Sequence, residues 1–221
     1  MKWQRPSEVQ CPEGQASMTR IVAMGDTHNR HASLVVPDGD ILIHAGDLTG
    51  RGSLPELEAV AAWLRSQPHP HKLVIAGNHD FALERNPVAA RALFQGLTFL
   101  EDSEVTVAGL RIWGSPWQPW FHSWAFNLQR GADIDAKWKL IPEGIDVLVT
   151  HGPPLGFGDL VDRQERVGCE DLLRHLGRVR PKLHLFGHIH EDRGAWQLGP
   201  IRVVNCTVSE CELPVTVIDL P

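Results

Sequence analysis

Short apolar runs in this sequence end repeatedly in side chains that bind metal ions. Residues 73–75 are apolar, and Asn78, His79 and Asp80 follow within one turn, which brings an amide, an imidazole and a carboxylate together. A run of this kind bounded by turn residues is typical of a buried strand. Four more runs, at 21–24, 41–43, 147–149 and 183–186, end in the same manner, and their polar residues are Asp26, His28, Asp47, His151, His188 and His190. These strand ends therefore direct oxygen and imidazole groups toward one place.

This set of side chains suits a pair of transition-metal ions. Two ions about 3.5 to 4 Å apart need one carboxylate that bridges them and further nitrogen and oxygen ligands, with positions left open for water and substrate. The absence of cysteine from the set favours manganese, iron, cobalt or zinc, with manganese first. We expect Asp47 to bridge the ions, with Asp26, His28 and His190 completing one sphere and Asn78, His151 and His188 the other.

The second and third of these strands enclose a helix. A glycine-rich loop follows the strand at 41–45, and Ser53 and Glu56 then have the spacing of a capping box, with Pro55 in the first helical turn. A strand, a helix and a strand in this order form a right-handed βαβ unit with a parallel sheet, whose ligands bind at the carboxyl ends of the strands. Asp47 lies at such an end.

The remaining elements are predicted from the same kinds of pattern. They are a helix from Asn86 to about Gln95 ended by Gly96, a hairpin of strands 105–107 and 110–113 around Ala108 and Gly109, a strand at 147–150, a helix from Cys169 to Leu176 ended by Gly177, and strands at 183–186, 201–204 and 215–220. The hairpin makes the sheet mixed. The fold class is therefore α/β, with two packed mixed sheets flanked by helices.

An aromatic stretch at residues 113–126 carries four tryptophans and two phenylalanines. Pro116 and Pro119 interrupt it, and prolines exclude a regular element there. Two interpretations stay open. The stretch is either a hydrophobic plug that closes one edge of the core or a wall that faces the substrate.

Composition excludes several other classes of protein. With 221 residues, 43% of them hydrophobic, the chain is long enough for one domain with a full core, which we predict at residues 19–221 behind a flexible leader at 1–18. A net charge of −6 argues against a polynucleotide partner. The sequence lacks a membrane-length apolar window and a signal-type apolar run, and its four cysteines form no close Cys-x-x-Cys pair. We expect a cytoplasmic protein with free thiols, no membrane partner and a small substrate.

The other histidines have simpler interpretations. His44 and His184 lie inside predicted strands, and we expect them to be packed or hydrogen-bonded. His69 and His71 flank a proline in a turn, and we expect them on the solvated surface. His122 lies in the aromatic stretch, where it could contact a substrate.

Five sequence blocks carry a family resemblance. They occur in the order GDTH at 25–28, GDLTGRG at 46–52, GNHD at 77–80, THGPP at 150–154 and GHIH at 187–190. Together they resemble the metallophosphoesterase (calcineurin-like phosphoesterase) superfamily, and over residues 19–221 the chain is similar to its metallophosphoesterase-domain, class III cyclic-nucleotide phosphodiesterase-like group. The resemblance implies a four-layer αββα sandwich and the ligand set given above. It also makes His79 the imidazole that faces the scissile phosphate.

Two positions depart from the pattern of this group. Some members carry glycine at the position of His188, which weakens the second metal site, and the histidine present here raises the expected activity. The group often lacks a basic residue in the second block, whereas Arg51 matches the arginine with which phosphoprotein phosphatases hold phosphate oxygens. Two interpretations of Arg51 stay open, a phosphate ligand and a solvent-exposed loop charge.

The sequence and the resemblance together predict a dinuclear phosphodiesterase for small phosphodiesters, with cyclic nucleotides among its substrates. A metal-bridging hydroxide would attack phosphorus in line, His79 would protonate or stabilise the leaving oxygen, and Asp80 would orient His79. The flat rings between Trp117 and Trp124 could stack a base. Arg51 keeps a phosphomonoesterase or protein phosphatase as the alternative. A non-catalytic scaffold of the same fold is a third interpretation, against which the intact ligand set argues.

Overall fold

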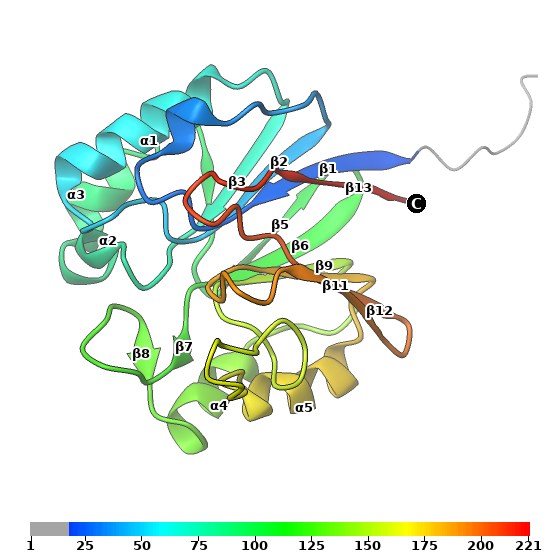
Figure 1. The fold of residues 1–221 in the computed structure, drawn as a ribbon. Helices are drawn as coiled ribbons and strands as arrows, with labels where there is room; N and C mark the ends of the chain where they lie inside the picture. The colour runs from blue at the N-terminus through cyan, green and yellow to red at the C-terminus, as the bar shows by residue number, and fades with distance from the viewer. Residues whose placement is uncertain (1–17) are drawn as a thin grey trace, which may run out of the picture.

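The computed structural model describes residues 18–221, which form two β-sheets packed face to face between helices (Figure 1). The predicted α/β class with two mixed sheets flanked by helices is confirmed. The leader predicted at residues 1–18 lies outside the described residues apart from Met18. Within the described part of the chain, every helix is too short or too polar to cross a membrane.

The first sheet has five strands in the order β13-β1-β2-β3-β4. Strands β1 to β4 run parallel, and β13 pairs antiparallel with β1 at one edge. Their bounds are Thr19–Met24 for β1, Ile41–Ala45 for β2, His71–Ile75 for β3, Thr98–Phe99 for β4 and Thr216–Leu220 for β13. Because parallel strands end at the same edge, the loops after β1, β2 and β3 lie together.

The second sheet has six strands in the order β11-β12-β10-β9-β6-β5. Strands β12, β10, β9 and β6 run parallel, and an antiparallel hairpin closes each edge. The bounds are Ser103–Val107 for β5, Leu110–Ser115 for β6, Val147–Thr150 for β9, Leu183–Phe186 for β10, Gly194–Leu198 for β11 and Ile201–Asn205 for β12. The predicted β5–β6 hairpin is confirmed, and Ala108 and Gly109 in its turn both have positive φ, as a type I′ turn requires.

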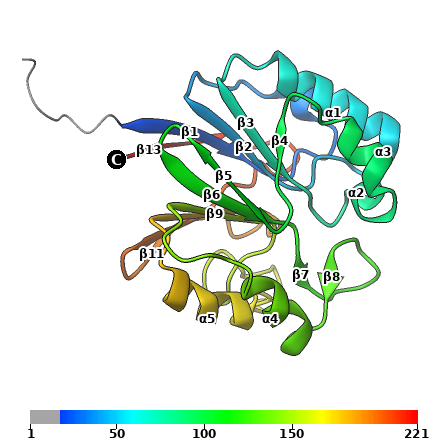
Figure 2. The same cartoon turned by 180° about the vertical axis from the view of Figure 1, so that it is seen from behind.

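Helices cover the outer face of each sheet (Figures 1 and 2). On the first sheet they are α1 (Leu54–Ser66), α2 (Phe81–Arg85) and α3 (Pro87–Ala92), with the 3-10 turn η1 (His31–Ser33) nearby. On the second they are α4 (Ala132–Trp138) and α5 (Glu170–Val179). The predicted capping box of α1 is present, and the Ser53 N–H donates to Glu56 Oε2 at 2.8 Å.

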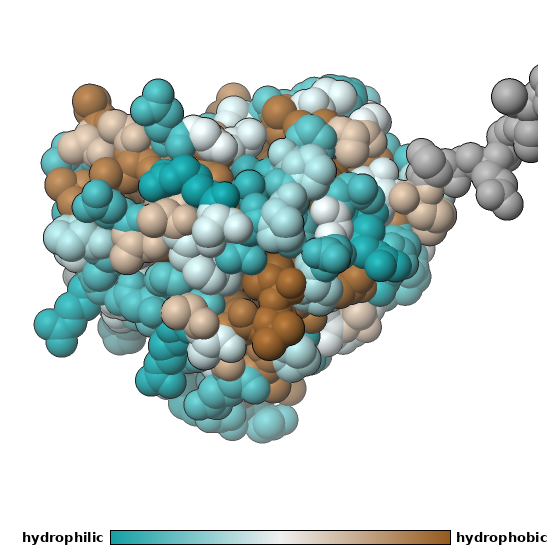
Figure 3. Space-filling view, turned by 90° about the horizontal axis from the view of Figure 1, so that it is seen from above, coloured by the Kyte–Doolittle hydropathy of each residue, from teal (hydrophilic) through white to brown (hydrophobic). Residues whose placement is uncertain are grey.

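The alternation of side chains along each strand builds a core in three layers. Ile21 and Ala23 of β1 lie between the two sheets, whereas Val22 and Met24 pack on the side of α1. A third cluster, which includes Trp138 of α4, lies between the second sheet and its helices. Seen from above, polar residues cover most of the surface and the apolar ones form small patches (Figure 3).

Several boundaries differ from the sequence prediction. The helix predicted at 86–95 is the shorter α3, which ends at Ala92 in a series of turns, and Asn86 begins it without a side-chain capping bond. The helix α5 continues through Gly177, and Arg180 instead takes the left-handed conformation that ends it. Strands β4 and β11 and helices α2 and α4 were not predicted.

Candidate metal centre

The carboxyl ends of strands from both sheets meet at one edge of the sandwich. Backbone hydrogen bonds join the two sheets there, since the Gly25 N–H at the end of β1 donates to the Cys206 carbonyl after β12 at 3.2 Å. All seven predicted metal ligands lie just past strand ends at this edge: Asp26, His28, Asp47, Asn78, His151, His188 and His190.

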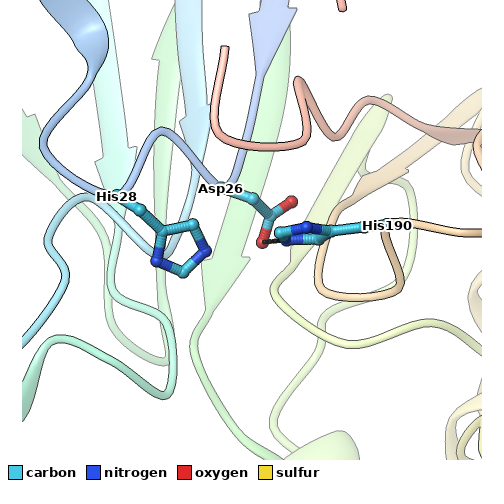
Figure 4. A group of neighbouring side chains, drawn as sticks. All are labelled: Asp26, His28 and His190. Carbon is cyan, nitrogen blue, oxygen red and sulfur yellow. Dashed lines mark ion pairs between the residues drawn. The ribbon is translucent and has the colours of Figure 1, made fainter. Parts of the chain in front are cut away.

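The first group of candidate ligands is Asp26, His28 and His190, whose side chains converge in Figure 4. One ligand atom from each lies within 4.8 Å of the other two, and His190 Nε2 is 3.7 Å from Asp26 Oδ1. Asp26 is fully buried, and the His188 N–H donates to both of its carboxylate oxygens at 3.0 Å. These bonds fix the direction of the carboxylate, so the three side chains can hold one cation between them.

The second group is Asp47, His151 and His188, whose ligand atoms again lie within 4.8 Å of one another. His151 Nε2 is 3.4 Å from Asp47 Oδ1 and 2.9 Å from Asn78 Oδ1. Two oxygen acceptors therefore face one ring nitrogen, an arrangement that a divalent cation among them would satisfy.

Asp47 lies between the two groups. Its Oδ1 faces His151, and its Oδ2 is 3.7 Å from His28 Nε2. Each carboxylate oxygen is thus turned toward one group, as a bridging carboxylate requires. The donors are imidazole nitrogens and carboxylate and amide oxygens, so the residues fit two divalent transition-metal ions that share Asp47.

Backbone carbonyls fix the rings of two of the histidines. His28 Nδ1 donates to the Thr49 carbonyl at 3.2 Å, and His151 Nδ1 donates to the Ala45 carbonyl at 2.9 Å. Because Nδ1 carries the hydrogen in each ring, the lone pair of the neutral form is on Nε2, which faces the centre.

The backbone at the ligands is strained. Asp26, His28, Asp47 and His188 have φ of +59°, +40°, +53° and +71°, a region that residues other than glycine rarely occupy. Such conformations persist where the surroundings enforce them, and they gather at functional sites. Gly77 shows how tight the site is, because a Cβ there would collide with the backbone and carboxylate of Asp47.

The electrostatics of the centre also suit cations. Burial alone would raise the pKa of Asp47, but His151 and His28 hold that pKa well below its ordinary value. Burial likewise opposes a proton on His151, yet Asp47 and Asp26 raise the pKa of His151 to about 9. The buried carboxylates thus favour a positive charge beside them. A divalent cation would supply that charge in place of the proton.

Comparison with known proteins identifies the family. The family model described as calcineurin-like phosphoesterase matches residues 19–192. The chain belongs to this family. Metallophosphoesterase domain-containing protein 1 of Homo sapiens is 45% identical over an alignment 232 residues long, and the match covers 92% of this chain and 71% of the human protein. UPF0046 protein T07D4.2 of Caenorhabditis elegans is 36% identical over 218 residues, which cover 85% of this chain and 55% of the worm protein.

Solved structures share the fold of this calcineurin-like phosphoesterase. The TT1561 protein of Thermus thermophilus matches it with a TM-score of 0.60 and 12% identity, over 92% of this chain and 99% of that one. Another solved structure matches with a TM-score of 0.69 and 14% identity, over 93% of this chain and all of that one. These likenesses concern the arrangement of helices and strands, which agrees with the sandwich that the resemblance implied.

His79 of the phosphoesterase centre lies beside the ligands, in a group with His28 and Asp47. Its Nδ1 donates to the Gly50 carbonyl at 2.9 Å, and its ring stacks on Trp124 with the centroids 4.2 Å apart. The backbone N–H of His79 donates to Asp47 Oδ1 at 2.8 Å. The ring is therefore fixed by a carbonyl on one side and an indole on the other.

Asp80 lies between two loops of the first sheet. Its buried carboxylate accepts the N–H groups of Leu48, Thr49 and Gly77 at 3.2, 3.0 and 2.8 Å, and the Thr49 hydroxyl at 2.7 Å. Asp80 thus ties the loop after β2 to the loop after β3, while the Gly50 carbonyl orients the His79 ring. Its oxygens point into these loops, and the expectation that Asp80 orients His79 stays a prediction. Burial raises the pKa of Asp80 to about 6.

A cavity of about 410 Å³ opens at the centre. Arg51 is exposed and does not line it, so phosphate binding by Arg51 stays a prediction. Two lining residues, Arg30 and Glu210, were not predicted from the sequence. Arg30 could have been found, since it follows His28 in the same loop, whereas no motif marks Glu210. The lining consists of His28, Arg30, Asp47, Gly50, Asn78, His79, Phe121, His188, His190 and Glu210.

The aromatic stretch divides between its two interpretations. Trp117 belongs to the plug: its Nε1 donates to Asp102 Oδ2 at 3.0 Å, and the Lys137 ammonium lies 4.3 Å from the ring centroid. Phe121 and Trp124 belong to the wall, because Phe121 lines the cavity and Trp124 stacks on His79.

A short regular element does exist in that stretch, contrary to prediction. Strand β7 (Gln118–Pro119) pairs with β8 (Asn127–Leu128). The Gln118 N–H donates to the Phe126 carbonyl at 3.0 Å and the Trp120 N–H to the Leu128 carbonyl at 2.7 Å. Because these donors flank Pro119, the missing N–H of the proline is not needed.

The other histidines are mostly as expected. The Nε2 of His44 is 3.0 Å from Thr27 Oγ1, and that of His184 is 2.8 Å from Thr150 Oγ1, so both are packed and hydrogen-bonded. His69 is buried rather than solvated, because it packs beside the backbone of the turn that precedes β2. His71 is half-buried, and the exposed His122 does not line the cavity.

Proposed function

We propose that this phosphoesterase is a dinuclear metal-dependent phosphodiesterase for small phosphodiesters, cyclic nucleotides among them. The observation that carries the proposal is the arrangement of two ligand groups around Asp47 with His79 in the same cavity. The bound ions, with manganese favoured, would neutralise phosphate oxygens and lower the pKa of the attacking water. In this proposal the residues that hold them are Asp26, His28, Asp47, Asn78, His151, His188 and His190.

In this proposal His79 is the general acid. Its Nδ1 hydrogen is held by the Gly50 carbonyl, so Nε2 is the atom that would carry the transferred proton. That proton can be given to the leaving oxygen of the ester. The stacked Trp124 keeps the ring in place while the proton moves.

Two features of the cavity favour diesters over monoesters. Phe121 offers an aromatic face in the cavity, and stacking of a base on such a face contributes about 1 to 3 kcal/mol. A diester also carries one negative charge fewer than a monoester dianion. Arg30 is the one lysine or arginine among the described residues that line the cavity, and it is paired with Glu210.

A hydrolysis panel with metal analysis tests the proposal. We expect the purified protein to bind two equivalents of manganese and to hydrolyse bis(p-nitrophenyl) phosphate and cyclic nucleotides faster than p-nitrophenyl phosphate. Asp47→Ala should lose both metal and turnover, because both ligand groups share this carboxylate. Faster hydrolysis of monoesters would favour a phosphomonoesterase or protein phosphatase. Neither metal nor hydrolysis under manganese supplementation would favour a scaffold.

A further inference from the structure

An ion pair lies at the mouth of the cavity, and the metal-centred chemistry does not use it. Arg30 Nη2 is 3.0 Å from Glu210 Oε2, and both residues line the cavity together with His28 and His190. Apart from Asp47, Glu210 is the one carboxylate among the described lining residues. The Glu210 carboxylate would repel a phosphate ester, and a carboxylate that binds no metal is unusual in a site for an anion.

The segment that presents Glu210 is strained and firmly held. Ser209, Glu210 and Cys211 have φ of +46°, +56° and +70°, and three consecutive left-handed residues without glycine are costly. The Glu210 N–H donates to the Asp26 carbonyl at 2.9 Å, which ties the segment to the first ligand loop. Strain of this kind is kept where it positions a functional side chain.

The ion pair between Arg30 and Glu210 contributes little to the stability of the fold. The side chains of Arg30 and Glu210 are 58% and 43% exposed, and an ion pair this exposed contributes little to folding. Both residues line the cavity, so their charges would act on an anion that enters it. Glu210 offsets the charge of Arg30 and leaves the mouth nearly neutral beyond the metal centre.

We propose that Arg30 binds a non-bridging phosphate oxygen and that Glu210 makes the site select diester monoanions over monoester dianions. A dianion meets the Glu210 carboxylate with twice the charge of a monoanion, so Glu210 disfavours it more strongly. Arg30 can still bind a single phosphate oxygen, because its guanidinium has more N–H donors than the pair with Glu210 uses. This inference rests on the proposed function and names the residue that sets its substrate class.

The test compares Glu210→Gln with a matched ion pair at the far end of β1. Arg20 and Asp219 form that pair, with an N–O distance of 2.9 Å and side chains 53% and 44% exposed. In manganese-loaded protein, Glu210→Gln should raise the ratio of kcat/KM for p-nitrophenyl phosphate to that for bis(p-nitrophenyl) phosphate by about three- to tenfold. Asp219→Asn should leave the ratio unchanged. Arg30→Gln should weaken the binding of both substrates.

Binding provides a second readout that does not depend on turnover. Titration calorimetry should show that Glu210→Gln tightens the binding of phenylphosphonate, a dianion, more than the binding of methyl phenylphosphonate, a monoanion. Equal changes for the two probes, or none, would overturn the role of Glu210. A wild-type preference for monoesters would instead contradict the proposed function, and the shift caused by Glu210→Gln would still be measurable against it.

Discussion

Two pairs of histidines at the sheets differ in what Nε2 faces. In His28 and His151 a backbone carbonyl takes the Nδ1 hydrogen and Nε2 faces the metal centre. In His44 and His184, Nε2 meets a threonine hydroxyl, and burial lowers the pKa of each ring to about 3. Position separates the two pairs, since the ligands follow strand ends and the packed rings lie within strands.

The pKa of His184 predicts a loss of stability in acid. The folded protein keeps the ring neutral down to about pH 3, whereas the unfolded chain takes up the proton near its ordinary pKa of 6.5. The stability that depends on a neutral ring is therefore present above pH 6.5 and is lost as the pH falls toward 3. At about pH 5, protonation of this group in the unfolded chain lowers the free energy of unfolding by about 2 kcal/mol.

Urea denaturation in the presence of a chelator measures this loss. Between neutral pH and about pH 5, the free energy of unfolding of His184→Gln should fall by about 2 kcal/mol less than that of the wild type. The glutamine amide keeps a donor for Thr150. His122→Gln, at an exposed histidine, should behave like the wild type. Identical pH dependence in His184→Gln and the wild type would contradict the prediction.

At the scale of elements, the segment after β6 has two roles: some of its aromatic rings pack on the core and others face the cavity. Trp117 packs against both outer core clusters, Trp120 is 55% exposed, and Phe121 lines the cavity. The pairing of β7 with β8 fixes which ring faces inward, because it orients the backbone on either side of Pro119. One stretch of chain can therefore serve as plug and wall at once.

Alanine substitutions should separate the two jobs. Trp117→Ala removes core contacts and the hydrogen bond to Asp102, so it should lower the free energy of unfolding by about 2 to 4 kcal/mol. Trp120→Ala removes an exposed ring and should change it by less than about 0.5 kcal/mol. Denaturant titration of the two variants checks this, and similar losses in both would show that Trp117 is not part of the plug.

At the scale of the whole molecule, the candidate ligands come from both sheets. Asp26, Asp47 and Asn78 belong to loops of the first sheet, and His151 and His188 to loops of the second. Cations at this edge would therefore hold the two halves of the sandwich together. Anything that binds the folded state alone stabilises it by mass action.

Removal of metal should lower the thermal stability. With manganese at about a hundred times its Kd, the gain is about 2.7 kcal/mol, or a Tm about 5 to 10 °C higher than in chelator. Differential scanning calorimetry before and after chelation measures the shift. Asp47→Asn should abolish most of it, whereas Asp219→Asn should retain it. A shift that survives in Asp47→Asn would contradict the shared role of Asp47.

Much of the site could be predicted because its signals are local. Asp47 and Asn78 follow strands of one βαβ unit, and the parallel sheet brings such strand ends together whatever the rest of the chain does. The direction of a loop side chain is not local in this sense. Arg51 and Arg30 both stand near ligands in the sequence, yet only Arg30 lines the cavity. Glu210 reaches it through a loop that follows β12, far along the chain.

The missed elements lacked the usual sequence signals. Helix α4 begins after Gly131, which has positive φ and no side chain to cap the helix. Strand β4 has two residues, too few for a visible alternation. Helix α5 passes through Gly177 because that glycine meets open space and has no special conformation to adopt. The local sequence pattern therefore leaves these three features open.

The pairing of β1 with β13 has a consequence for the order in which the protein is made. Thr19 lies opposite Leu220, so the edge partner of β1 emerges from the ribosome long after β1 itself. Until then β1 presents an unpaired row of backbone donors and acceptors, which can template association with another chain. Pairing between such distant segments is also slow, because a long loop must close first. The nascent protein therefore stays exposed to association until β13 has been made, with the strand that leads into Asp26 at the open edge.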